Sequence, residues 1–199
     1  YGTYYLREVK APEGYLLNTE DIQFKVIAER DWENPLVVAC EDVPAMGKIH
    51  LKKTDKESEE ALAGAVFNVI AAENITTPDG TLQAAKAEVV TTLTTGSDGT
   101  ATSTALHFGK YKLVETKAPN GYVTSEKNWD VTLSYADQET EIVTKDVSVT
   151  NTPNEVKIKK VAADSQEALA GVEFQVWKKG TSAKDNLFDL YYADKPLFL

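Results

Sequence analysis

The chain contains a single cysteine, Cys40, which excludes an internal disulfide and a metal site built from several thiolates. Two histidines leave few groups for metal binding or for acid–base chemistry. With 21 basic against 31 acidic residues the net charge is -10, which argues against a nucleic acid or an anionic membrane surface as partner. We therefore expect no metal and no cofactor.

Long apolar runs are also missing, because no stretch approaches the roughly 20 residues that a membrane-spanning helix needs. The opening residues YGTYYLREVK do not form a secretory signal peptide, so we expect a piece of a longer protein or a processed form. The catalytic patterns G-x-S-x-G, H-E-x-x-H and G-x-x-x-x-G-K are absent. A turnover enzyme is not predicted.

Two segments recur with the same spacing of 107 residues. YYLREVKAPEGY at 4–15 matches YKLVETKAPNGY at 111–122, and LKKTDKESEEALAGAVFNV at 51–69 matches IKKVAADSQEALAGVEFQV at 158–176. A shared offset indicates one repeating unit of about one domain length.

The order of the repeated parts predicts one complete domain between two halves. We expect the C-terminal half of a domain at 1–46, a complete domain at 47–154 and the N-terminal half of a further domain at 155–199. The junctions between them are short, so consecutive domains should be closely coupled.

Short runs rich in β-branched and aromatic residues fill the complete repeat. They are IHLKK, AVFNVIA, AEVVTTLT, YKLVETK, WDVTLSY and VSVTN, separated by turn sequences such as TPDG, GSDG and APNGY. Several short strands at this spacing favour an antiparallel β-sandwich. The fold class predicted is all-β.

Three of these runs place a polar residue where the next inward-facing residue should be. Alternate residues of a strand point to the same face of a sheet. On that face Lys53 follows Ile49 and Leu51, Glu115 follows Tyr111 and Leu113, and Asn151 follows Val147 and Val149. Either these side chains lie at strand ends in water, or they are buried for a reason.

If they are buried, the three residues are reagents for an amide bond. Burial favours a neutral lysine amine, which is a nucleophile, and a neutral carboxyl, which can carry protons. The carboxamide of Asn151 supplies the electrophilic carbon for Lys53, with Glu115 moving protons and ammonia leaving.

The flanking halves copy this pattern. Glu8 corresponds to Glu115, Lys160 to Lys53, and Asp42 to Asn151 with aspartate in place of asparagine. Cys40 falls on the inward face of the same flanking strand, so we expect it to be a small core residue.

These motifs resemble the B-type domain of Gram-positive collagen-binding adhesins, a domain also found in pilins and called SpaA-like. The resemblance rests on K-K-T-D…LAGAVF, GKYKLVETKAPNGY and V-T-N-T-P, and covers the whole chain. It implies an immunoglobulin-like, reverse-topology β-sandwich with a self-generated isopeptide bond between the first and last strands. Lys53 would be its amine, Asn151 its acyl partner and Glu115 its catalytic carboxyl, while Lys160, Asp42 and Glu8 would play these parts in the cut copies.

The function implied by the resemblance is mechanical: a stalk segment of an adhesin or pilin on a bacterial cell surface, with single-turnover chemistry only. Its partners would be neighbouring domains of the same protein, and half-domains of separate molecules could associate head to tail. A sorting signal of the LPxTG kind and a pilin YPK lysine are absent. The alternative is a ligand-binding sandwich that uses the long stretch 71–88 and forms no internal bond.

Overall fold

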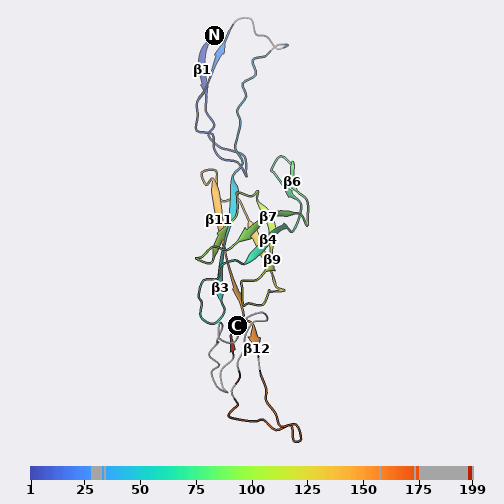
Figure 1. Ribbon diagram of the computed structural model, residues 1–199. Coiled ribbons are helices and arrows are strands. Elements are labelled where there is room, and N and C mark those ends of the chain that lie inside the picture. The colour runs from blue at the N-terminus through green and yellow to red at the C-terminus, as the bar shows by residue number, and fades with distance from the viewer. Residues whose placement is uncertain (28–32, 34, 157, 173, 175–196, 199) are drawn as a thin grey trace, which may run out of the picture. The chain divides into compact units, whose positions relative to one another are not determined.

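The computed structural model describes residues 1–27, 33, 35–156, 158–172, 174 and 197–198 (Figure 1). The described residues form strands and no helix, which confirms the all-β prediction. The chain divides into two units, one comprising 1–119 with 124–151 and the other comprising 120–123 with 152–199.

Thirteen strands are present among the described residues. They are β1 (Gly2–Leu6), β2 (Ile22–Val26), β3 (Met46–Asp55), β4 (Val66–Ala71), β5 (Ile75–Thr76), β6 (Leu82–Ala84), β7 (Val89–Thr94), β8 (Thr100–Thr102), β9 (Gly109–Lys117), β10 (Asn128–Leu133), β11 (Ile142–Asn151), β12 (Glu155–Val156) and β13 (Leu197–Phe198). Each of the six runs predicted in the complete repeat overlaps one of them.

Two sheets of the first unit form the sandwich. One has the order β10-β9-β4-β7 and is antiparallel, and the other has the order β11-β3-β8. Within the second sheet β3 pairs with β8 in antiparallel fashion but with β11 in parallel, in register from Met46 opposite Ile142 to Asp55 opposite Asn151. The first and last strands of the complete repeat therefore lie side by side and run in one direction (Figure 1).

The core lies between these sheets and consists of β-branched, leucine and aromatic side chains. Ile49 and Leu51 of β3, Phe67 and Val69 of β4, and Leu113 of β9 are completely buried. Phe67 also meets Trp129 edge to face, with ring centroids 5.9 Å apart, an arrangement that adds to the stabilisation from area burial. The alternating pattern of the sequence thus becomes the two inner faces of one sandwich.

The inward row of β3 does not stop where its apolar residues stop. Burial alternates along the strand, so Lys53 and Asp55 continue the row that Ile49 and Leu51 begin. The row ends in a tight turn, in which the N–H of Asp55 donates to the carbonyl of Glu60 at 2.8 Å. Charged side chains therefore enter the interior at this end of the sandwich.

The region 1–44 contains β1 paired with β2, and Tyr4 stacks on Phe24 across this hairpin. A bridge between Tyr15 and Pro44 closes the region, and the equivalent bridge in the second unit joins Tyr122 and Pro153. The two copies of the A-P-x-G-Y loop thus make the same backbone contact with their following segments.

The prediction of a core position for Cys40 is wrong. Cys40 is exposed, and residues 35–43 form no strand. In the complete repeat the corresponding strand, β11, pairs along its whole length with β3. The described part of the chain supplies no such neighbour to 38–42, so these residues gain neither a hydrogen-bonding ladder nor a covering sheet.

In the second unit, β12 pairs with β13 and Val161 bridges to Ala168. The bridge matches the one between Thr54 and Ala61 in the first unit, 107 residues earlier. The counterpart of the predicted strand AVFNVIA is VEFQVWK at 172–178, and most of it lies outside the described residues, as do residues 179–196.

Two glycines allow a matched test of the packing behind Lys53. Gly80 and Gly99 both have positive φ, but a Cβ at Gly80 would meet nothing, whereas a Cβ at Gly99 would lie 2.5 Å from the carbonyl oxygen of Lys53. We expect Gly80→Ala to cost about 1 kcal/mol from backbone strain alone, and Gly99→Ala about 2 kcal/mol or more because β3 must also shift. Urea unfolding measures both, and equal losses would contradict the close approach.

A buried lysine, glutamate and asparagine between the sheets

Lys53 is the first member of the candidate site and is completely buried although it carries an amine. Its Nζ lies 3.4 Å from the carbonyl oxygen of Thr54. Burial lowers the pKa of Lys53 from 10.5 to about 8, against the charges of Glu115 and Asp55, which raise it. At pH 7 roughly a tenth of such amines are neutral, against fewer than about one in a thousand for an ordinary lysine.

Asn151 reaches the same interior from the neighbouring strand. It is the last residue of β11 and only 3% exposed. In the parallel ladder Val149 is opposite Lys53 and Asn151 is opposite Asp55, so Asn151 and Lys53 project from the same face of the sheet. The pairing of the first strand with the last is what brings two residues so far apart in the sequence to one place.

Glu115 approaches from the facing sheet. It lies on β9 opposite Phe67 of β4, is only 4% exposed, and does not mark the end of its strand, which continues to Lys117. Its two oxygens each accept a hydrogen bond from Nδ2 of Asn151 at 3.0 Å. Oε2 also accepts the N–H of Ser125 at 2.6 Å, which further fixes the carboxyl group.

Only one of the two polar atoms in the carboxamide of Asn151 has a hydrogen-bond partner among the described residues. Its nitrogen is held by Glu115, whereas its oxygen Oδ1 is buried without a hydrogen-bond partner among the residues that the structure describes. A buried acceptor without a donor is costly, about 1–3 kcal/mol. The side chain is therefore held with its nitrogen against a carboxyl group and with an oxygen that still needs a proton donor.

Sequence reasoning missed one member of the group, Asp55. It is 4% exposed, and its Oδ1 accepts the N–H groups of Glu57 and Ser58 at 2.7 and 2.8 Å. The signal was present in the alternation, because Asp55 is the next residue of the same parity after Lys53. An aspartate directly in front of a turn is usually a solvated cap, so the alternation alone does not distinguish a buried Asp55 from an exposed one.

The flanking copies show part of the same arrangement. Oε2 of Glu8 accepts the N–H of Asn18 at 2.7 Å, which reproduces the bond from Ser125 to Glu115 at an offset of 107. Glu8 and Asp42 are half-buried, and no hydrogen bond joins them among the described residues. Lys160 is exposed and belongs to the second unit.

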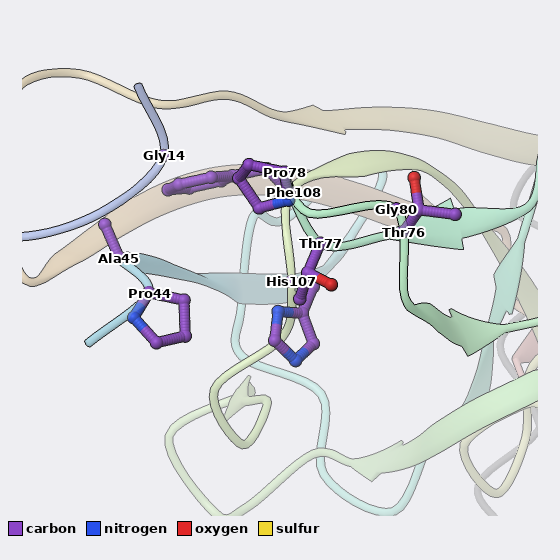
Figure 2. Close-up of a pocket in the computed structure, with 9 residues that line it drawn as sticks. All are labelled: Gly14, Pro44, Ala45, Thr76, Thr77, Pro78, Gly80, His107 and Phe108. Atoms are coloured by element: carbon purple, nitrogen blue, oxygen red, sulfur yellow. The ribbon is translucent and has the colours of Figure 1, made fainter. Parts of the chain in front are cut away.

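A hollow of the first unit overlaps the stretch 71–88 that the sequence suggested for ligand binding. Figure 2 shows its lining, which comprises Gly14, Pro44, Ala45, Thr76, Thr77, Pro78, Gly80, His107 and Phe108. The one titratable side chain of this lining is His107, and burial lowers its pKa, which favours the uncharged imidazole. Nothing in the lining selects a class of ligand.

Other kinds of site find no support in the described part of the chain. No group of three or more histidine, cysteine, aspartate or glutamate side chains there is arranged to hold a metal ion. In the same residues, no helix is long and apolar enough to span a membrane.

The fold and the buried group together define the class: an all-β sandwich with an amine, a carboxyl and a carboxamide gathered between its sheets. The chain belongs to the SpaA prealbumin-like fold domain family, whose model matches residues 1–35 and 47–148. The resemblance to B-type and SpaA-like domains that the sequence motifs indicated is thereby confirmed.

Similar proteins come from Gram-positive bacteria. The chain is 28% identical over 122 residues to the trypsin-resistant surface T6 protein of Streptococcus pyogenes, covering 61% of this chain and 20% of that protein. It resembles the Bacillus anthracis TIE protein with a TM-score of 0.56 and 25% identity, over 77% of this chain and 25% of that one. The backbone protein of the group B streptococcus pilus 2b matches at 29% identity and a TM-score of 0.41, over 57% of this chain and 43% of that one. The chain thus spans only a fifth of the curated relative's length.

The buried amine predicts how stability depends on pH when no bond forms. In Asn151→Ala, Lys53 of the unfolded chain keeps its proton up to pH 10.5, while the folded chain releases it near pH 8. The unfolded state therefore binds more protons between these values, and the free energy of unfolding should rise with pH across the window by up to about 3 kcal/mol.

A second variant, Lys53→Met in the same Asn151→Ala background, isolates this contribution, because methionine fills similar space without a titrating group. Chemical unfolding at a series of pH values gives the difference between the two proteins. A difference that stays flat, or falls, from pH 8 to 10.5 would show that the lysine is not held in a desolvated place.

Proposed function

We propose that this chain is a load-bearing stalk segment of a Gram-positive cell-surface pilin or adhesin, and that its complete repeat is closed by an isopeptide bond between Lys53 and Asn151. The observation that carries the proposal is the buried contact of Asn151 Nδ2 with both oxygens of Glu115, beside a buried lysine with a lowered pKa. Membership of the SpaA family and the likeness to a streptococcal surface protein support the location.

The chemistry follows from the positions of the three groups. The neutral amine of Lys53 attacks Cγ of Asn151 and forms the new C–N bond, while Glu115 takes a proton from Nζ and delivers it to Nδ2. The bond between Cγ and Nδ2 then breaks and ammonia leaves, so the products are one amide and one ammonia. Glu115 contacts the leaving nitrogen beforehand, which is where the proton must arrive.

Proximity replaces a cofactor in this reaction. Groups that a folded core holds in a reactive arrangement reach effective molarities up to about 10⁵–10⁸ M. A carboxamide that is inert in water could then react once without a cofactor or a metal. No turnover follows, since the amine and the acyl group are both consumed.

The bond would change the path that force takes through the domain. A pulling force along the chain would enter the complete repeat at the start of β3 and leave it at the end of β11, because these are its first and last strands. With Lys53 joined to Asn151, the covalent path runs along β3 to Lys53 and crosses directly to Asn151. Residues 54–150 then carry no load. The in-register ladder of β3 with β11 cannot be sheared apart, because the bond joins the two strands near its end.

The same link would stabilise the repeat at equilibrium. By analogy with disulfides, closing a loop of about 100 residues contributes roughly 4–5 kcal/mol through the entropy of the unfolded chain. We expect the kinetic effect to be larger, because terminal strands that are covalently joined cannot be peeled apart. A protein exposed outside the cell benefits from both effects.

We also propose that the half-domains can complete one another between molecules. The region 1–44 holds the counterparts of Glu115 and Asn151, namely Glu8 and Asp42, while Lys160 is the counterpart of Lys53. Side chains of the β1–β2 hairpin that would face a covering sheet, such as Tyr4 and Leu6, are exposed. A head-to-tail contact of this kind is open and would produce chains rather than closed dimers.

The intact mass of the denatured protein tests the internal bond. We expect a deficit of one ammonia, mapped by digestion to a branched peptide that contains Lys53 and Asn151. Lys53→Ala, Glu115→Gln and Asn151→Ala should each restore the full mass, and Lys52→Ala, which changes the exposed neighbour on the same strand, should not. An unmodified mass for the original chain would overturn the proposed bond.

Thermal unfolding tests the mechanical role of the bond. We expect Glu115→Gln to lower Tm by about 20 °C or more, because roughly 4–5 kcal/mol of stabilisation disappears while lysine and asparagine stay in place. Resistance to trypsin should fall in parallel. A Tm within a few degrees of the original, in a protein whose mass shows that the bond is missing, would mean that the bond does not stabilise the fold.

A denaturing gel tests pairing between molecules. We expect multimers that survive boiling in detergent, with one water lost per junction because the acyl partner is an aspartate. Asp42→Ala and Lys160→Ala should abolish them, whereas Lys159→Ala, at the adjacent exposed lysine, should not. A single monomer band for the original chain would exclude the covalent form of this pairing.

A further inference from the structure

We propose that Asp55 is a positioning residue for the proposed bond: it holds the turn that fixes the end of β11, and its negative charge keeps a proton on Lys53. This inference rests on the proposed function, because its importance lies in the reaction between Lys53 and Asn151. Asp55 is a buried carboxylate that takes no part in the proton transfers between Lys53, Glu115 and Asn151, and the proposal gives it a role.

The positioning role rests on a chain of hydrogen bonds. Oδ1 of Asp55 accepts the N–H groups of Glu57 and Ser58, which closes the turn after β3. Within that turn the N–H of Lys56 donates to the carbonyl oxygen of Asn151 at 3.0 Å. The backbone of the acyl partner is therefore tied to a turn that the carboxylate of Asp55 organises.

Register gives Asp55 its second role. It is directly opposite Asn151 in the parallel ladder and is two residues from Lys53 on the same inward row. The charged groups that act on Lys53 are Glu115 from the facing sheet and Asp55 from its own strand, while Asn151 from β11 is neutral. Glu115 is needed to move protons in the reaction. The negative charge of Asp55, in contrast, favours the ammonium form of Lys53, which is not the nucleophile.

The two roles have opposite consequences for the reaction. Loss of the turn should slow bond formation at every pH, since near-attack geometry is lost. Loss of the charge alone should favour the neutral amine and speed the reaction below pH 8. Asparagine keeps the Oδ1 acceptor but removes the charge, and alanine removes both, so Asp55→Asn and Asp55→Ala separate the two effects.

Asp137 offers a matched control. Its Oδ1 accepts the N–H groups two and three residues ahead, Glu139 at 2.9 Å and Thr140 at 2.7 Å, as Asp55 does with Glu57 and Ser58. Unlike Asp55 it is exposed. Asp137→Asn therefore makes the same chemical change in the same kind of turn without altering the interior.

The first experiment does not depend on bond formation. In the Asn151→Ala background, NMR titration of the Lys53 side chain should show a midpoint lower by about one pH unit when Asp55→Asn is added. Asp137→Asn should leave the midpoint unchanged. An unchanged or higher midpoint in Asp55→Asn would overturn the electrostatic role, even if the original chain forms no bond.

The second experiment measures the reaction itself. Chain recovered unreacted from inclusion bodies is refolded at fixed pH, and the loss of ammonia is followed by mass spectrometry. We expect the rate profile of Asp55→Asn to move to lower pH by about the same one unit, and Asp55→Ala to react at least about tenfold more slowly at all pH values. Bond formation by Asp55→Ala at the original rate would overturn the positioning role.

The two proposals fail in different ways. If the original chain refolds with its full mass, the isopeptide proposal is wrong and the titration alone judges the charge of Asp55. If the original chain loses ammonia, Asp55→Asn reacts like the original chain at every pH and Asp55→Ala reacts slowly, the charge does not oppose the reaction and only the turn matters, which overturns the electrostatic half.

Discussion

The parallel, in-register pairing of β3 with β11 is the constraint on which the rest of the site depends. It makes neighbours of the first and last strands of a repeat, so that residues nearly a full repeat apart in sequence share one inner face. Asn151 is opposite Asp55, two residues beyond Lys53 on this ladder, and the facing sheet supplies Glu115, which contacts Asn151. A slip of one residue in this pairing would turn either side chain to the solvent.

Burying these groups has a free-energy cost that an apolar core would avoid. A desolvated amine, a carboxyl group and an unpaired amide oxygen each oppose folding, and an ion pair in such a place often contributes less than leucine or methionine would. Their presence is understandable if the folded state is not the final product. An amide between Lys53 and Asn151 removes the buried amine and leaves a neutral covalent link in its place.

The two copies of the Glu-bearing strand show which features are local and which need the whole sandwich. The hydrogen bond from a backbone N–H to the glutamate carboxylate recurs at Glu8 and Glu115. The β-bridge from the tyrosine of A-P-x-G-Y to a following proline recurs at Tyr15 and Tyr122. Both lie within one half of the repeat. Burial does not recur to the same degree. Glu8 is only half-buried, and Cys40 is exposed although the corresponding residues of the complete repeat lie on β11, the partner of β3.

The sequence by itself determined the class of fold and the six strand runs of the complete repeat. It also showed that Lys53, Glu115 and Asn151 continue apolar rows, because alternation has a period of two. It also shows two segments that recur at an offset of 107 residues, since that needs only comparison of letters. Only the tertiary structure decided which strands are neighbours, that the nitrogen of Asn151 rests on Glu115, and that Asp55 joins the group. It also decided that Cys40 stays outside. The physical reason is that parity assigns a side chain to a face, whereas burial and contact depend on whether another strand lies beside it and another sheet covers it.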